Sequence, residues 1–212
     1  LPGRPIYCIP NTNHAIVISA GLKGNSGIGG NYVLSASYSI VNKMIFYSNI
    51  FYPPTSGMDQ RGNYFTIQPD DAEVFNVHGE LSGKFSKRMS FNSSVDYYKY
   101  TLSANQYAWN KPDWKGRMGL FYNLRDKIIA GAEVTALGSR KLLVGQLAMI
   151  PVGGGVTPDS RVIEQPVHVN LGLSAEYRYT RILSFWVKVD NVSWNRYYEW
   201  AFYPSQMFNI MA

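Results

Sequence analysis

Hydrophobic and polar residues alternate along residues 166–189. Side chains of a β-strand point alternately to the two faces of a sheet, so this pattern predicts a strand with one apolar and one polar face. The apolar positions run from Val167 to Tyr179, and polar residues such as Glu176 and Arg178 lie between them. Such a strand is longer than the roughly five or six residues typical of soluble sheets. It is close to the roughly nine to eleven residues that cross a membrane.

The same alternation recurs elsewhere and predicts an all-β chain. About eleven strands are expected between Asn13 and Ala212, one of them across the less regular residues 141–150. The stretch 44–52 alternates poorly, so its register stays open. No segment has a helical period, and no apolar run reaches the roughly 18 residues of a spanning helix. Apart from the hairpin above, the clearest strands are expected at 32–40, 75–85, 91–97, 114–123 and 128–136.

The connections between these strands alternate in length. A transmembrane β-barrel has short turns at one rim and long loops at the other, so the alternation favours an antiparallel transmembrane β-barrel. A modest loop is expected at 23–29. Short turns are expected at 41–43, 86–88, 125–127 and 180–181, and long loops at 53–71, 103–112, 151–165 and 195–205.

Composition agrees with this class. Charged residues make up 16% of the chain, below the roughly 25% of a soluble domain, and aromatic residues make up 15%, with 16 Tyr. Aromatic rings are typical of both membrane interfaces. The net charge of +6 comes from Lys and Arg scattered without a basic run, so no nucleic-acid partner is expected. The single Cys8 excludes an internal disulfide and a cysteine-cluster metal site.

Candidate chemistry is sparse. His14, His78 and His168 lie on separate expected strands without ligand spacing, so no metal site is predicted. Nothing in the sequence selects a catalytic pair of carboxylates. The carboxylates expected on the polar strand faces, Glu80, Asp96, Glu133 and Glu176, are therefore interpreted as part of a charged, hydrated network in the lumen. Neither an enzymatic activity nor a cofactor is therefore expected.

The C-terminal residues 185–212 resemble the closing hairpin of TonB-dependent outer-membrane receptors. In that family a strand ends in a segment of the form V-x-N-hydrophobic-x-N-x-x-Y. Similar features fall here at 187–190, Asn191, Val192, Asn195 and Tyr198. A Tyr203-Pro204 turn and a final strand from Met207 follow. The Tyr- and Asn-rich loops are similar to those of receptors from the Bacteroides group. The family's last strand normally continues beyond the position of Ala212 to a terminal aromatic residue.

The resemblance implies a bacterial outer-membrane protein that contacts lipid. It takes up or binds an unidentified substrate through its lumen and extracellular loops. TonB and a surface-exposed partner protein would act through parts outside this chain. Residues 1–212 are expected to form a single barrel segment without the plug domain, either as half of a barrel of roughly 22 strands or as a smaller diverged barrel.

Three alternatives remain at this stage. They are a passive porin-like or structural barrel subunit, a soluble β-barrel or sandwich binding module with its apolar faces inward, and an outer-membrane enzyme. The leading interpretation places the substrate path on the polar strand faces and the loop aromatics. The candidate residues are Asn76, His78, Glu80, Asp96, Arg117, Glu133, His168, Asn170, Glu176, Arg178, Trp109, Trp200 and Tyr203.

Overall fold

The chain is all-β in a computed structural model that describes residues 12–26, 30–51, 63–147, 158–180, 182–194, 196–200, 203–205 and 207–212. No helix in these residues is long and apolar enough to cross a membrane. The strands are β1 (Asn13–Ser26), β2 (Gly30–Phe51), β3 (Asn63–Lys84), β4 (Met89–Leu102), β5 (Trp114–Leu124), β6 (Ile128–Leu137), β7 (Arg140–Leu147), β8 (Pro158–Gln165), β9 (His168–Arg178), β10 (Ser184–Asp190), β11 (Tyr198–Trp200), β12 (Tyr203–Pro204) and β13 (Asn209–Met211).

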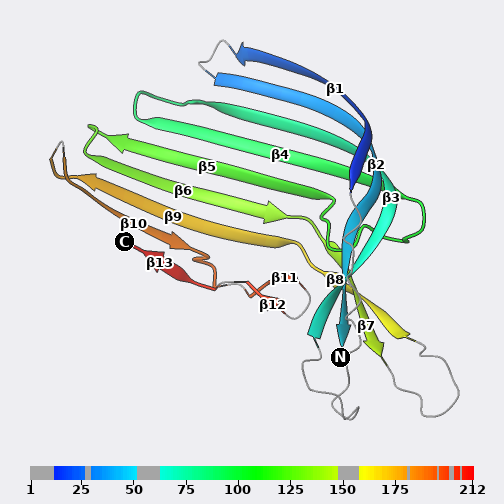
Figure 1. Ribbon diagram of the computed structural model, residues 1–212. Helices are drawn as coiled ribbons and strands as arrows, with labels where there is room; N and C mark the ends of the chain where they lie inside the picture. Colours follow the sequence, from blue (N-terminus) through cyan, green and yellow to red (C-terminus); the bar gives the residue numbers. More distant parts are fainter. Residues whose placement is uncertain are drawn as a thin grey trace, which may run out of the picture.

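Eleven of these strands form one sheet, which confirms the expected fold class and the approximate strand number. Nine of the eleven make a curved antiparallel wall in the order β1-β2-β3-β4-β5-β6-β9-β10-β13 (Figure 1). The other two, β7 and β8, form a hairpin that joins the far end of β2. There β2 and β3 continue beyond the wall, and together with this hairpin they form what we call the arm (Figure 1). The strands β11 and β12 pair separately.

The predicted alternation of connection lengths holds along most of the wall. Residues 85–88, 125–127 and 179–183 are the short connections between wall strands, and 103–113 is a long one. The tightest return uses Arg125 and Asp126, both at positive φ (54° and 57°). Lys127 N donates to Leu124 O at 3.1 Å across this turn, and Asn123 binds Asp126 through two further hydrogen bonds. Two positive φ values fit a hairpin turn that follows the twist of its strands.

The predicted turn at 41–43 is wrong, because β2 runs through it as one strand of 22 residues. The pairing with β3 shifts between Val41 and Met44, and Lys43 adopts a φ of 54°. Lys43 N donates to Asp71 Oδ1 at 2.8 Å, which fixes this β-bulge. A bulge changes which face alternate residues take, and this explains the poor alternation of 44–52.

Four predicted loops also contain strand. Residues 23–26 belong to β1, 63–71 belong to β3, 158–165 form β8, and the predicted loop 195–205 contains β11 and β12. Residues 27–29, 53–62 and 148–157 lie outside the described residues. The expected strand at 141–150 is observed as β7, at 140–147, in the arm rather than in the wall. The predicted turn at Tyr203-Pro204 is instead strand β12, which pairs with β11. Asn191, at a φ of 53°, does end β10 at a bend, as the family pattern predicts.

Each wall strand places apolar side chains on one face. Leu81 of β3 is 44% exposed and Leu173 of β9 is 42% exposed, and both lie on this face. One lateral row across the wall reads Phe91, Leu120, Ala132, Leu173, Val189 and Ile210. We call this side the apolar face and the opposite side the polar face. The wall is a single layer, so these apolar side chains have no second sheet against them.

The buried core lies where the arm meets the wall. Phe46 is fully buried, and Val41, Ala72, Trp109 and Leu142 are each at most 5% exposed. These residues come from β2, β3, β7 and the connection 103–113, so the core joins the arm to the end of the wall that carries the long connections.

Asp70 fastens the connection 103–113 to β3. Its carboxylate accepts hydrogen bonds from Ala104 N, Asn105 N and Asn105 Nδ2 at 2.7–3.1 Å. Asn105 Oδ1 in turn accepts a hydrogen bond from the buried Trp109 Nε1 at 3.0 Å. Asp70 pairs with Met44 beyond the part of β3 that pairs with β4, so it lies outside the wall. Burial raises the pKa of Asp70, but these hydrogen bonds outweigh burial and lower it below its usual value.

The fully buried side chain of Phe46 generates a stability prediction. Phe46→Ala should lower the free energy of unfolding by about 3–5 kcal/mol, because it leaves a cavity in the only packed region described here. The matched variant Phe185→Ala changes a 58% exposed ring and should cost about 1 kcal/mol or less. Urea unfolding of the full-length protein in detergent, followed by tryptophan fluorescence, measures both. Equal losses would contradict the assigned core.

The Asp70 contacts generate a prediction about pH. Because the pKa of Asp70 in the folded protein lies below its ordinary value of 3.8, the contribution of Asp70 to stability is present above that pH. It is lost as the pH falls through the folded-state value. Hydrogen exchange at the amides of Ala104 and Asn105, corrected for the intrinsic rate, should therefore accelerate in acid.

The matched variants for this test are Asp70→Asn and Asp71→Asn. Asp70→Asn should give fast exchange at Ala104 and Asn105 at every pH, since it removes the charged acceptor. Asp71→Asn changes the neighbouring carboxylate, which binds Lys43 instead, and should leave the exchange of this loop unchanged. If the amides of Ala104 and Asn105 stay protected from exchange in the Asp70→Asn variant, Asp70 does not hold this loop in place.

Candidate functional site

The strand register aligns the candidate residues of the polar face in lateral rows. One row reads Ser35, His78, Asp96, Lys115, Leu137 and His168. The next row reads Val33, Glu80, Ser94, Arg117, Thr135 and Asn170. Six of the predicted site residues therefore fall in two adjacent rows, although they come from four strands.

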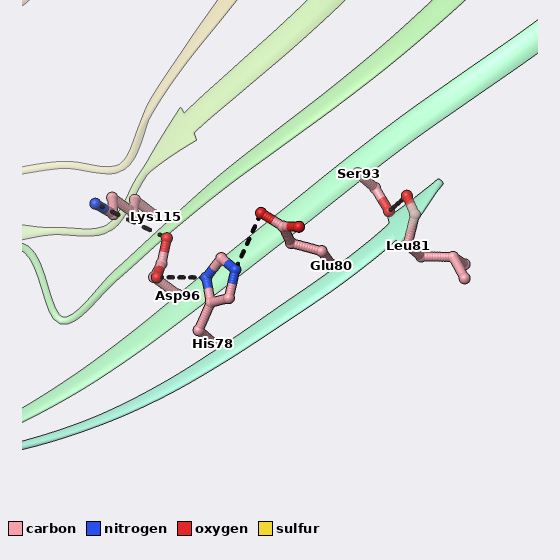
Figure 2. A network of polar contacts seen from close by, with 6 residues as sticks. All are labelled: His78, Glu80, Leu81, Ser93, Asp96 and Lys115. Atoms are coloured by element: carbon pink, nitrogen blue, oxygen red, sulfur yellow. Dashed lines mark hydrogen bonds and ion pairs between the residues drawn. The ribbon is translucent and has the colours of Figure 1, made fainter. Parts of the chain in front are cut away.

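A charged network occupies the middle of these rows (Figure 2). His78 Nδ1 lies 2.8 Å from Asp96 Oδ1, and His78 Nε2 lies 3.2 Å from Glu80 Oε1. Lys115 Nζ lies 3.8 Å from the other carboxylate oxygen of Asp96 and 5.4 Å from the centre of the Tyr98 ring. The network links β3, β4 and β5 on the polar face.

This arrangement does not make a metal site. Both ring nitrogens of His78 face carboxylate oxygens, which suits an imidazolium with two N–H donors rather than a free lone pair. Within the described residues no group of three or more His, Cys, Asp or Glu side chains is placed to hold a metal ion.

Arg117 lies between two hollows on the polar face. One hollow, of about 310 Å³, is lined by residues that include Asp96, Lys115 and Thr135. The other, of about 290 Å³, is lined by residues that include Glu80 and Asn92. Arg117 itself lines both and makes no ion pair or hydrogen bond with the part of the chain that the structure describes. Within the described residues its guanidinium is therefore unpaired.

Other predicted site residues lie apart from this network. Glu133 is one row further along, opposite Gly119. Asn76 donates through Nδ2 to the carbonyl oxygen of Tyr97 at 3.2 Å. Glu176 and Arg178 bind each other at 2.8 Å beside the short turn at 179–183, at the opposite end of β9 from His168. The structure thus brings some candidates together and separates others.

His168 and Asn170 lie near the long connections. His168 is 8% exposed, and its ring stacks on Tyr197 with the centroids 3.5 Å apart. His168 Nε2 and Asn170 Oδ1 are both buried and have no hydrogen-bond partner among the described residues. Tyr197 covers this end of the polar face, and its role was not foreseen from sequence.

The predicted loop aromatics have different surroundings. Trp109 is 5% exposed and packs edge-on against Tyr107, so it lies in the buried core. Trp200 and Tyr203 instead belong to a surface cluster. Trp200 packs edge-on against Tyr47 and Phe65, at 5.4 and 5.6 Å, and Tyr203 lies 5.4 Å from Phe65. The cluster ties β11 and β12 to the arm.

A third and larger hollow, of about 560 Å³, lies beside the connection 103–113. Four tyrosines line it, together with polar side chains that include Asn105, Gln106 and Asp113. The rings of Tyr98 and Tyr100 stack nearly parallel, 6.0 Å apart. The lining tyrosines are Tyr97, Tyr98, Tyr100 and Tyr107.

Asp70, Lys115 and Tyr197 are not among the site residues predicted from sequence. Lys115 was placed on the correct face by alternation, but its pairing with Asp96 follows only from the register of β4 and β5. The contacts of Asp70 and Tyr197 join segments at least 29 residues apart. No local sequence pattern predicts such contacts.

Comparison with solved structures identifies the fold. The copper transporter OprC has a TM-score of 0.65 at 16% identity, and the match covers 96% of this chain and 31% of OprC. The ferripyoverdine receptor of the outer membrane of Pseudomonas aeruginosa has a TM-score of 0.65 at 16% identity, over 92% of this chain and 26% of the receptor. The FpvAI–pyocin S2 complex gives 0.65 at 15% identity, over 92% and 25%.

These neighbours are TonB-dependent receptors, as the C-terminal resemblance implies. No family model and no curated protein matches the chain. The chain spans between a quarter and a third of the length of the structures it matches. At this level of identity the likeness shows the fold alone: the chain has the fold of a section of the barrel wall of TonB-dependent outer-membrane receptors.

Proposed function

We propose that this chain is the barrel wall of an outer-membrane receptor that takes up or binds a substrate along its polar face and its long connections. The observation that carries the proposal is the separation of the two faces of the wall. One face exposes large apolar side chains, and the other carries the charged network around His78.

The apolar face supports contact with lipid. Soluble monomers rarely expose contiguous apolar patches larger than a few hundred square ångströms, whereas this face continues across the wall strands. The strands β5, β6 and β9 have 11, 10 and 11 residues, which match the roughly nine to eleven residues that cross a bilayer. A soluble module with inward apolar faces needs the opposite arrangement, so we disfavour it.

The polar face and the long-connection end supply the proposed substrate path. His78, Glu80, Asp96 and Arg117 lie together on that face, and the tyrosine-lined hollow opens beside residues 103–113. The substrate is unidentified. The solved neighbours are named for copper and ferripyoverdine, and those names describe these proteins only.

Further parts of the proposal rest on the resemblance. TonB and a surface-exposed partner would act through parts of a receptor outside this chain, and one neighbour was solved in complex with pyocin S2. Residues 1–212 would form a single segment of the barrel without the plug domain. Kinship with receptors of the Bacteroides group stays a prediction. A passive porin-like barrel shares the same wall, and independence of uptake from TonB would identify it.

Matched substitutions on the two faces of β2 test the membrane assignment. Leu34 is 50% exposed on the apolar face, and Ser37 lies on the polar face of the same strand. Leu34→Lys should destabilise the protein in lipid vesicles by about 2–4 kcal/mol, because a charged side chain near the middle of the bilayer is costly. Ser37→Lys should change stability by much less, since its side chain meets the polar lumen.

Unfolding by urea in vesicles measures both variants, and fractionation of cell envelopes measures their assembly. Wild type and Ser37→Lys should appear in the outer-membrane fraction, and Leu34→Lys should be depleted there. Equal tolerance of the two substitutions, or recovery of wild type in the aqueous fraction, would contradict the membrane assignment.

A further inference from the structure

We propose that the hollow between Glu80 and Arg117 binds a short zwitterionic peptide. The carboxylate of the peptide would bind Arg117, and its ammonium group would bind Glu80. This inference rests on the proposed function, because it takes the polar face to be the substrate path, and it names the chemical class of the substrate.

The geometry places opposite charges on two sides of one hollow. Glu80 on β3 and Arg117 on β5 both pair with Ser94 on β4, one from each side. Two strand spacings therefore separate their backbones by roughly 10 Å. The short side chain of Ser94 leaves the space between them open, and the hollow has a volume of about 290 Å³.

Both charged groups have capacity for a ligand. Arg117 makes no ion pair or hydrogen bond with any described residue, and a guanidinium binds a carboxylate through two parallel hydrogen bonds. Glu80 contacts His78 through Oε1, and its side chain is 53% exposed (Figure 2). Lys115 is the neighbouring cation, but Asp96 already pairs with it.

The charges around the hollow favour a ligand that carries both a positive and a negative charge. The carboxylates near it are Glu80, Asp96 and Glu133, and the cations are Lys115 and Arg117, with His78 between two of the carboxylates. No single sign dominates, so neither a polyanion nor a polycation is favoured.

The floor of the hollow suits peptide groups. Besides Glu80 and Arg117, the hollow is lined by Leu81, Ser82, Asn92, Ser93 and Ser94, and four of these five have hydroxyl or amide side chains that can both donate and accept hydrogen bonds. An extended peptide advances roughly 3.4 Å per residue, so three residues span roughly 10 Å, the backbone separation of Glu80 and Arg117. Triglycine is therefore a matched probe, because it has both charges and no side chains.

Calorimetric titration of the full-length protein in detergent with triglycine tests the proposal. Two blocked probes isolate the charges: N-acetyl-triglycine lacks the ammonium group, and triglycine amide lacks the carboxylate. Wild type should bind triglycine, and each blocked probe should bind at least about 10-fold more weakly, because each loses a charge-assisted hydrogen bond.

The variants assign each loss to one residue. In Glu80→Gln, triglycine should bind at least about 10-fold more weakly, and N-acetylation should have no further effect. In Arg117→Gln, amidation should have no further effect. Arg125→Gln, in the short turn at the rim, is the matched control and should bind like wild type.

Each contrary result overturns the inference. These results are no binding of triglycine at millimolar concentration, equal binding of the blocked probes, or equal weakening by Arg125→Gln. The proposed function has its own readout in the Leu34→Lys and Ser37→Lys pair. If that pair behaves as a membrane wall requires and triglycine does not bind, the peptide inference fails and the proposed function stands.

Discussion

Lateral hydrogen bonding of extended strands is the constraint on which the rest of this structure depends. A strand in a single-layer wall pairs its N–H and C=O groups with those of its neighbours, and in the proposed membrane setting lipid offers no replacement. The same extended backbone sends successive side chains to opposite faces. Backbone pairing therefore assigns alternate residues to opposite faces, so an alternating sequence gives each strand an apolar and a polar face. The successive ladders of the wall align these faces from strand to strand.

This constraint explains what the sequence could predict. The strands expected at 114–123 and 128–136 are observed at 114–124 and 128–137, because a period of two is visible in a single segment. The turn predicted at 41–43 was wrong because a β-bulge holds there, and the bulge depends on Asp71, 28 residues away from Lys43. A tight turn and a β-bulge have similar local composition, and only the distant partner, Asp71, distinguishes the bulge from a turn.

The candidate site shows the same limit. Alternation placed His78, Glu80, Asp96 and Arg117 on one face, but only the strand register shows that Asp96 lies opposite His78 and that Ser94 separates Glu80 from Arg117. Trp109 was predicted from its place in a long loop. Its hydrogen bond to Asn105, which itself binds Asp70, holds it in the core, and the sequence does not predict this burial. The burial of a loop residue depends on which residues the loop binds elsewhere in the chain. The alternation of strand residues does not predict those contacts.

The wall and the arm obey different physical rules. Within the described residues the most buried apolar side chains, such as Phe46 and Leu142, lie in or beside the arm, whereas the middle of the wall has no second layer. Packing stabilises the arm, and in the proposed function lipid covers the apolar face of the wall. The charged network can persist on the other face because its members pair with one another: His78 with two carboxylates, and Lys115 with Asp96. Arg117 departs from this rule. It lies beside those paired groups and makes no ion pair or hydrogen bond with the described residues, and this is the feature on which the proposed peptide site depends.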